Sequence, residues 1–194
     1  MGSESPLLES ADPFVRGWEY LQAARQLAPV GDVVAISNHI GDRIRICTWI
    51  GENICAVNQE LLDCLEACHQ CFYPAKRPQC HILAVPLASH LRIDALCNIL
   101  IEPTTILIDV GRIHPPDWLA AVVHEYAHAY LKAPGHDRLF YDVLTHLCLG
   151  LGLNTPPLAT EALLRHWPPY QPPTDPLAFW LGAPNLVATE RGPQ

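Results

Sequence analysis

The first third of the chain carries both helical and strand-like patterns. Apolar residues recur at helical spacing over residues 14–27, directly after Asp12, which suits a helix N-cap. Residues 32–40 and 42–50 are rich in β-branched side chains and meet at a Gly-Asp pair, so they predict two strands in a hairpin. Helical periodicity returns over residues 58–72 and ends before a proline.

The rest of the chain predicts strands, then two helices, then a proline-rich tail. Strand-like segments cover residues 81–88, 91–101 and 105–113. Helical patterns follow over 116–133 and, capped by Asp137, over 137–150. Residues 155–194 are rich in proline and predict an extended strap with one short helix at 159–167.

This order of elements predicts an α+β fold in three segments. Residues 1–80 form a helical and strand segment packed on the core, residues 81–154 form the core itself, and residues 155–194 form the tail. A chain of 194 residues suits one domain and buries a sizeable core without a metal or disulfide staple. A metal in such a chain is therefore expected to be functional.

Composition and charge narrow the expected location and partners. No uninterrupted apolar run approaches the roughly 20 residues of a membrane-spanning helix. The first residues lack the basic region and apolar core of a secretory signal, so we expect a cytoplasmic protein whose eight cysteines are thiols or metal ligands. A net charge of -8 argues against nucleic acid as the main partner. Nothing in the pattern specifies an oligomeric state.

The helix at 116–133 carries residues typical of a metal site. His124 and His128 are four positions apart, so they lie within about 40° of each other around a helix. Glu125 lies about 100° from His124 and borders the same region. In this H-E-x-x-H arrangement two imidazoles bind zinc and the glutamate acts as a general base.

A catalytic zinc usually has three protein ligands. We expect His136 as the third, because the Pro134-Gly135 break can turn the chain back toward the helix. Glu161 is the alternative, since some enzymes of this type take a glutamate from a later helix. Asp137 is expected to orient one of the ligands.

The segment HEYAHAYLKAPGHDRLFYDVL resembles the active-site region of SprT-like and WLM-type zinc metallopeptidases. The resemblance covers residues 81–152 and is specific over residues 124–140. The matching residues are His124, Glu125, His128, Gly135, His136 and Phe140. The metzincins are excluded because they need a methionine turn, and the only methionine is Met1.

The resemblance implies a zincin-like minimal metallopeptidase domain, with a small sheet packed on the H-E-x-x-H helix. It implies Zn²⁺ on the three histidines, Glu125 as the general base and a peptide or protein as the substrate. The strand at residues 105–111 is the best candidate for the edge at which the substrate pairs, and an ordinary core strand is the alternative for this segment. Arg138, Tyr141 and His146 are near in sequence, but none clearly supplies an oxyanion donor.

Two other classes of function remain open. A non-proteolytic protein could use the same metal-binding zincin fold as a binding or assembly module. A structural protein without metal would simply pack its histidines in the core.

The cysteines offer a second candidate site. Cys64, Cys68 and Cys71 have the C-x3-C-x2-C spacing of radical SAM iron-sulfur sites, but they fall in a helical pattern in a chain too short for that barrel. That spacing places them on one helix face, where buried thiols pack as small hydrophobic groups. The alternative is a structural zinc site built from Cys68, Cys71, Cys80 or His81.

Overall fold

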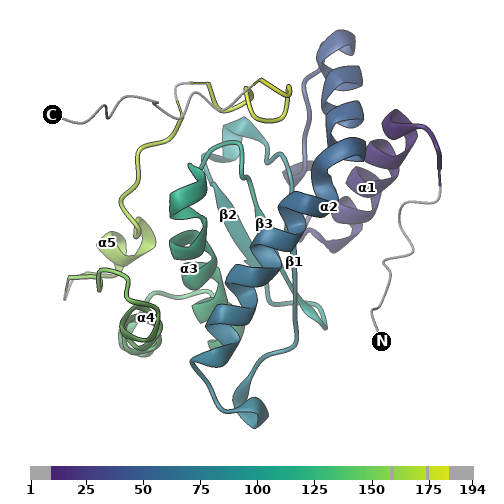
Figure 1. Ribbon diagram of the computed structural model, residues 1–194. Helices are drawn as coiled ribbons and strands as arrows, with labels where there is room; N and C mark the ends of the chain where they lie inside the picture. The colour runs from purple at the N-terminus through teal and green to yellow at the C-terminus, as the bar shows by residue number, and fades with distance from the viewer. Residues whose placement is uncertain (1–9, 158–159, 174, 184–194) are drawn as a thin grey trace, which may run out of the picture.

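The protein is described by a computed structural model over residues 10–157, 160–173 and 175–183, and it has the expected α+β class (Figure 1). The helices in this part of the chain are α1 Pro13–Leu27, α2 Ile40–Gln70, α3 Trp118–Leu131, α4 Arg138–Leu151 and α5 Glu161–Arg165. The strands are β1 Cys80–Ala84, β2 Ala95–Asn98 and β3 Thr104–Ile108. None of the described helices is long and apolar enough to cross a membrane.

The three strands form one mixed sheet in the order β1-β3-β2. β3 pairs in parallel with β1 and antiparallel with β2, and all five of its residues are buried. The prediction that residues 105–111 form an edge strand is therefore wrong. The free edge that lies beside the helix α3 belongs to β2.

The predicted hairpin at 32–50 is also wrong, because residues from Ile40 onward form the long helix α2. The buried positions of α2 include Ile46, Ile50 and Ile54, which recur every four residues along one face. Packing of this face outweighs the strand preference of its β-branched side chains. Within the first predicted strand, at residues 32–40, Val34 forms an isolated antiparallel bridge with Leu87.

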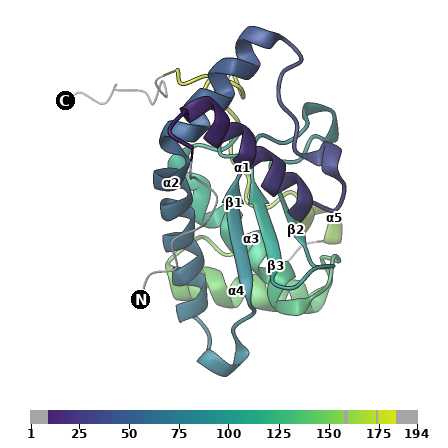
Figure 2. The same ribbon diagram turned by 90° about the vertical axis from the view of Figure 1, so that its right-hand side faces the viewer.

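Helices cover the sheet on both faces and along one edge. In Figure 2, α1 crosses the near face, α3 lies behind the strands and α2 runs alongside β1. Tyr20 of α1 donates a hydrogen bond of 2.8 Å to the carbonyl oxygen of Ala84 in β1. One continuous hydrophobic core contains residues from all three predicted segments of the chain.

The helix α3 lies at the centre of this arrangement. It packs against α2, α4, β2 and β3, and it is buried almost all round. The chain leaves α3 at Lys132 in the left-handed conformation, with φ 52°. It turns back and starts α4 at Asp137, whose side chain accepts a hydrogen bond of 3.1 Å from the Phe140 amide. The predicted cap and the turn that returns His136 are both present.

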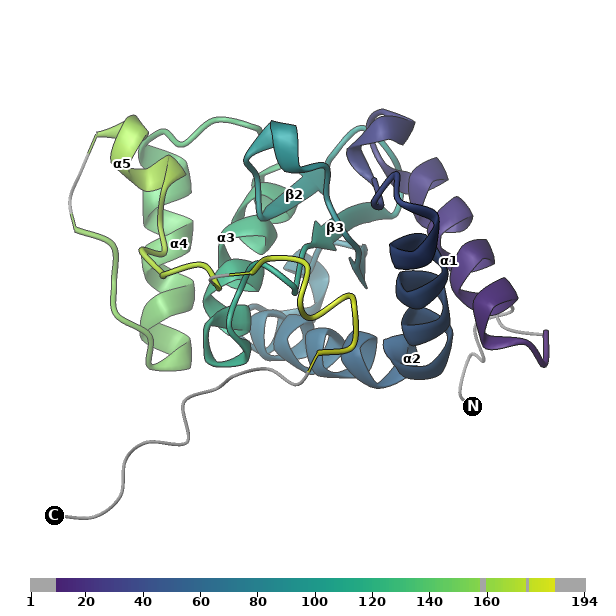
Figure 3. The same cartoon turned by 90° about the horizontal axis from the view of Figure 1, so that it is seen from above.

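The described part of the C-terminal tail is a strap packed across the domain, as expected. It runs from α5 back toward the N-terminal half of α2 (Figure 3). Trp180 is fully buried, and its indole nitrogen donates a hydrogen bond of 2.7 Å to Asp109. Its ring also contacts Trp49 of α2, with centroids 5.7 Å apart. The strap is therefore an integral part of the fold.

Candidate metal centre

Three imidazole nitrogens converge at the start of α4. The Nε2 atom of His136 lies 3.1 Å from Nε2 of His124 and 3.2 Å from Nε2 of His128. All three side chains are buried, and their ligand atoms lie within 4.8 Å of one another. The predicted convergence of the three histidines is confirmed, and the group is close enough to bind a metal ion.

A hydrogen bond determines which ring nitrogen of His128 carries the proton. Its Nδ1 atom lies 2.9 Å from the carbonyl oxygen of Ala133, which can only accept. Nδ1 therefore carries the proton, and in the neutral ring Nε2 presents a lone pair to the cluster. This is the usual arrangement for a histidine that binds a metal.

The spacing of the nitrogens fits a tetrahedral ion. Two ligands at a Zn–N distance of about 2.0–2.1 Å lie roughly 3.3 Å apart at a tetrahedral angle. The two Nε2 distances of 3.1 and 3.2 Å are close to this value. The lone pair on Nε2 of His128 faces this group, and imidazole nitrogens are common zinc ligands, so the donor set suits a metal cation.

Burial keeps these rings neutral and ready to bind. It lowers the pKa of His124 to about 3, helped by the neighbouring His128 and His136, while the nearby Trp167 backbone opposes the shift. Burial likewise lowers the pKa of His128, and it lowers that of His136 to about 4. Within the described residues, Nδ1 of His124 and of His136 has no hydrogen-bond partner of normal geometry.

Glu125 is a buried carboxyl group beside the three histidines. Burial raises its pKa to about 8. A cation within a few ångströms favours the carboxylate form and opposes this shift. The side chain lines two cavities and forms no ion pair among the described residues. It is thus available to accept a proton from a ligand in either cavity.

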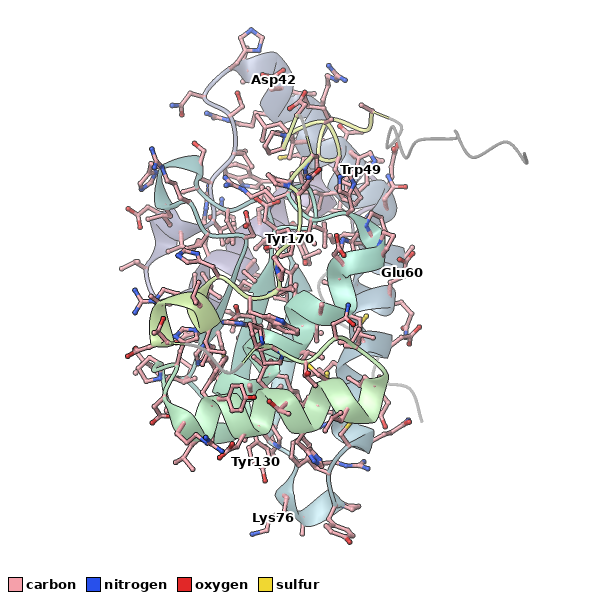
Figure 4. The ribbon with its side chains drawn as sticks, turned by 90° about the vertical axis from the view of Figure 1, so that its left-hand side faces the viewer. Asp42, Trp49, Glu60, Lys76, Tyr130 and Tyr170 are labelled. Carbon is pink, nitrogen blue, oxygen red and sulfur yellow. The ribbon has the colours of Figure 1, made fainter. Side chains whose placement is uncertain are left out.

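The two cavities form what we call the cleft. One has a volume of about 460 Å³ and the other about 260 Å³, and both are lined by His124 and Glu125. Residues 93 and 95, before and at the start of β2, and Arg165 of α5 also line both cavities. The first cavity continues along residues 166–170 of the strap. Figure 4 shows this segment, with Tyr170, running from α5 over the face on which α3 lies.

Other residues singled out in the sequence are not part of the group of three histidines. Glu161, the alternative ligand, is exposed on α5 and lies 3.8 Å from Arg165. The side chain of Asp137 caps α4 through the Phe140 amide. Arg138 pairs with Asp142, and His146 lies 2.9 Å from the carbonyl oxygen of Cys71. Arg138, Tyr141 and His146 line neither cavity of the cleft.

The structure does not assemble the cysteines into a second metal site. Among the described residues, the three histidines are the only group of at least three potential ligands close enough to hold an ion. Cys68 is fully buried on α2, whereas Cys80 lies on β1 and the neighbouring His81 is exposed. Burial raises the pKa of the Cys68 thiol, which agrees with a packed and protonated side chain.

For several residues of the cleft, nothing in the sequence indicated that they lie near Glu125. Arg165 and Tyr170 belong to the proline-rich strap, more than thirty residues after the H-E-x-x-H helix. Cys97 lines the second cavity from β2. Their approach to Glu125 depends on how the strap and the sheet pack, which no local pattern encodes.

Comparisons of the chain with protein-family models, with curated proteins and with solved structures found no significant match. The chemistry of the cleft is therefore the basis for any assignment of function.

Proposed function

We propose that the protein is a zinc-dependent peptidase that hydrolyses peptide bonds in the cleft, with Glu125 as the general base. The observation that carries the proposal is the convergence of three Nε2 atoms beside an unpaired carboxyl group in one cleft. In catalytic H-E-x-x-H zinc sites the two histidines of the motif bind the ion together with a third protein ligand, and the glutamate beside them acts as the general base. The zincin-like fold implied by the sequence resemblance is part of the same proposal.

In this proposal, one set of residues binds the metal and another residue transfers the proton. His124, His128 and His136 would hold the ion, and the hydrogen bond to Ala133 keeps one ring in the required tautomer. Zinc, when bound, supplies Lewis-acid activation of water and of the peptide carbonyl. Glu125 accepts the proton of the attacking water and passes it to the leaving amine.

The edge strand β2 is the element best placed to position an extended substrate. No strand of the described residues pairs with its outer side, and its residues Ala95, Leu96 and Cys97 line the cleft. An extended peptide can add to such an edge through main-chain hydrogen bonds. In this proposal β2 replaces residues 105–111 as the substrate strand.

The test compares wild type with Glu125→Gln on a mixture of peptides, with cleavage read by mass spectrometry. We expect Glu125→Gln to bind one zinc ion per chain and to cleave about 10²–10⁴-fold more slowly, because the amide cannot accept the proton. Glu60→Gln is the matched control, since Glu60 is exposed on α2, away from the strap (Figure 4). It should cleave like wild type.

The same experiment separates the peptidase from the non-proteolytic alternative. A zinc-loaded wild type that cleaves no peptide in a broad mixture would favour a binding or assembly module. Equal cleavage by wild type and Glu125→Gln would show that the activity does not come from this site.

A further inference from the structure

Two arginines line the first cavity of the cleft together with Glu125. Arg92 comes from the loop before β2, and Arg165 comes from the end of α5. Arg165 also lines the second cavity, so it is shared by both parts of the cleft. The first cavity has no lysine in its lining, and its remaining basic side chain besides the zinc ligand His124 is His166.

Neither arginine is held by a strong ion pair. Arg165 lies 3.8 Å from Glu161, and both side chains are mostly exposed, so this pair contributes little. Among the described residues, Arg92 has no carboxylate within the 4.0 Å of an ion pair. Both guanidinium groups are therefore available to a ligand.

Two acidic groups also line the first cavity. Asp94 accepts a hydrogen bond of 3.0 Å from the Tyr170 hydroxyl and lies 3.9 Å from Arg112. Glu125, the other carboxyl group in the lining, has the proton-transfer role. The cavity therefore offers two weakly paired guanidinium groups to an anionic ligand, although the whole chain has a net charge of -8.

The backbone at Arg92 adds a second observation. Arg92 ends a short 3-10 turn, Ser89–Leu91, with φ 52° in the left-handed region. This conformation costs free energy for a residue other than glycine, and such strain concentrates at functional sites. A glycine would relieve the strain, but it would remove the guanidinium group from the cavity.

We propose that the cleft selects ligands with a carboxylate next to the group that meets the metal, and that Arg92 and Arg165 bind this carboxylate. The guanidinium group matches a carboxylate through two parallel hydrogen bonds. For the proposed peptidase, on which this inference rests, the carboxylate is an acidic side chain beside the scissile bond or the C-terminus of a short peptide. Arg92 and Arg165 then determine specificity and take no part in the proton transfer.

The first experiment measures binding rather than activity. Zinc-loaded wild type is titrated with the monohydroxamates of succinic, glutaric and adipic acid. Each is compared with a control compound that keeps the hydroxamate but has a carboxamide in place of the free carboxylate. The hydroxamate anchors each probe at the metal, and the arm length varies. We expect at least one acid to bind about 10-fold or more tightly than its amide, as is typical of a hydrogen bond to a charged group.

Variants assign this preference to the arginines. Arg92→Gln and Arg165→Gln should each reduce the preference for the acid and leave amide binding unchanged. Arg165→Lys should retain part of it, because the charge remains. Lys76→Gln is the control, since Lys76 lies at the far end of the molecule from Tyr170 (Figure 4). Acids that bind no better than their amides, or a preference that survives both glutamine variants, would overturn the inference.

Peptide pairs then distinguish the two sources of the carboxylate. Peptides that differ by Asp and Asn near the cleavage site test a side chain, and peptides with a free or amidated C-terminus test a chain end. Acid-selective binding without hydrolysis of any peptide would refute the peptidase and leave the carboxylate site standing. Hydrolysis without acid preference would refute only the carboxylate site. A chain that binds no zinc would bind neither kind of probe and would overturn both proposals.

Discussion

At the residue scale, Phe140 holds the three histidines in position. Its ring is fully buried, with centroids 5.0 Å from His124, 4.5 Å from His128 and 4.6 Å from His136. These contacts restrict the imidazole rings from one side, while the cleft opens on the other. Phe140 thus links the stability of the core to the geometry of the metal centre.

Phe140→Ala should lower the free energy of unfolding by about 3–5 kcal/mol, because it leaves a cavity in the core. It should also weaken zinc binding, since the rings lose their support. Denaturant unfolding and competition with a chelator measure the two effects. Leu139→Ala is the neighbouring control, because Leu139 is 64% exposed and should change both values little. Unchanged zinc affinity in Phe140→Ala would contradict the positioning role.

The sequence predicted much of the metal centre but not its supports. The spacing of His124 and His128 on a helix is a local property, and the proline-glycine break marked the turn that returns His136. The carbonyl of Ala133 and the side chain of Arg165 became visible only in the fold. A sequence pattern does not show which main-chain carbonyl a side chain will contact. Arg165 reaches the site only through tertiary packing.

At the element scale, glycines allow α1 and α2 to pack closely. A Cβ atom at Gly17 would overlap the backbone carbonyl of Cys47, and one at Gly51 would overlap the carbonyl of Pro13. Neither obstacle is a side chain that could rotate away. The first part of α2 was missed because its β-branched residues favour strands locally, whereas these tertiary contacts and the buried face favour a helix.

Gly51→Ala should therefore destabilise the fold, even though alanine is the better helix former by about 1 kcal/mol. We expect a lower midpoint of thermal unfolding. Gly41→Ala is the matched control in the same helix, because its Cβ would meet only the exposed side chain of His39, at 3.1 Å. Gly41→Ala should be neutral or stabilising. A Gly51→Ala protein as stable as wild type would show that α1 and α2 do not need this close approach.

At the scale of the whole molecule, the strap closes the fold over the sheet and builds one wall of the cleft. Asp109 follows β3 and joins these parts, because it accepts hydrogen bonds from Trp180, from the Leu87 amide and from Arg112. The sequence predicted a packed strap, but its contribution to the cleft depends on contacts between residues more than 70 positions apart.

The three buried histidines should make the metal-free protein sensitive to acid. Their pKa values in the fold, about 3 for His124 and about 4 for His136, lie below the value of about 6.5 in an unfolded chain. The unfolded chain therefore binds more protons as the pH falls below 6.5, so the free energy of unfolding decreases. Zinc should be released over the same range, because protons compete for the same nitrogens.

Urea unfolding of chelator-treated protein between pH 7 and pH 5 measures this effect. The Glu125→Gln background is suitable, because the raised pKa of Glu125 gives an opposing dependence on pH. Adding His136→Gln should reduce the slope. A free energy of unfolding that stays constant from pH 7 to pH 5 would contradict the burial of neutral histidines.

The most direct test of the metal centre is the zinc content of purified protein, measured by mass spectrometry on wild type, His136→Ala and His146→Ala. His146 is the control, because it is exposed and contacts the carbonyl oxygen of Cys71 instead of the cluster. We expect about one zinc ion per chain in wild type and His146→Ala, and a large loss in His136→Ala. A wild type without metal, or a His136→Ala protein that keeps its zinc, would contradict the three-histidine centre.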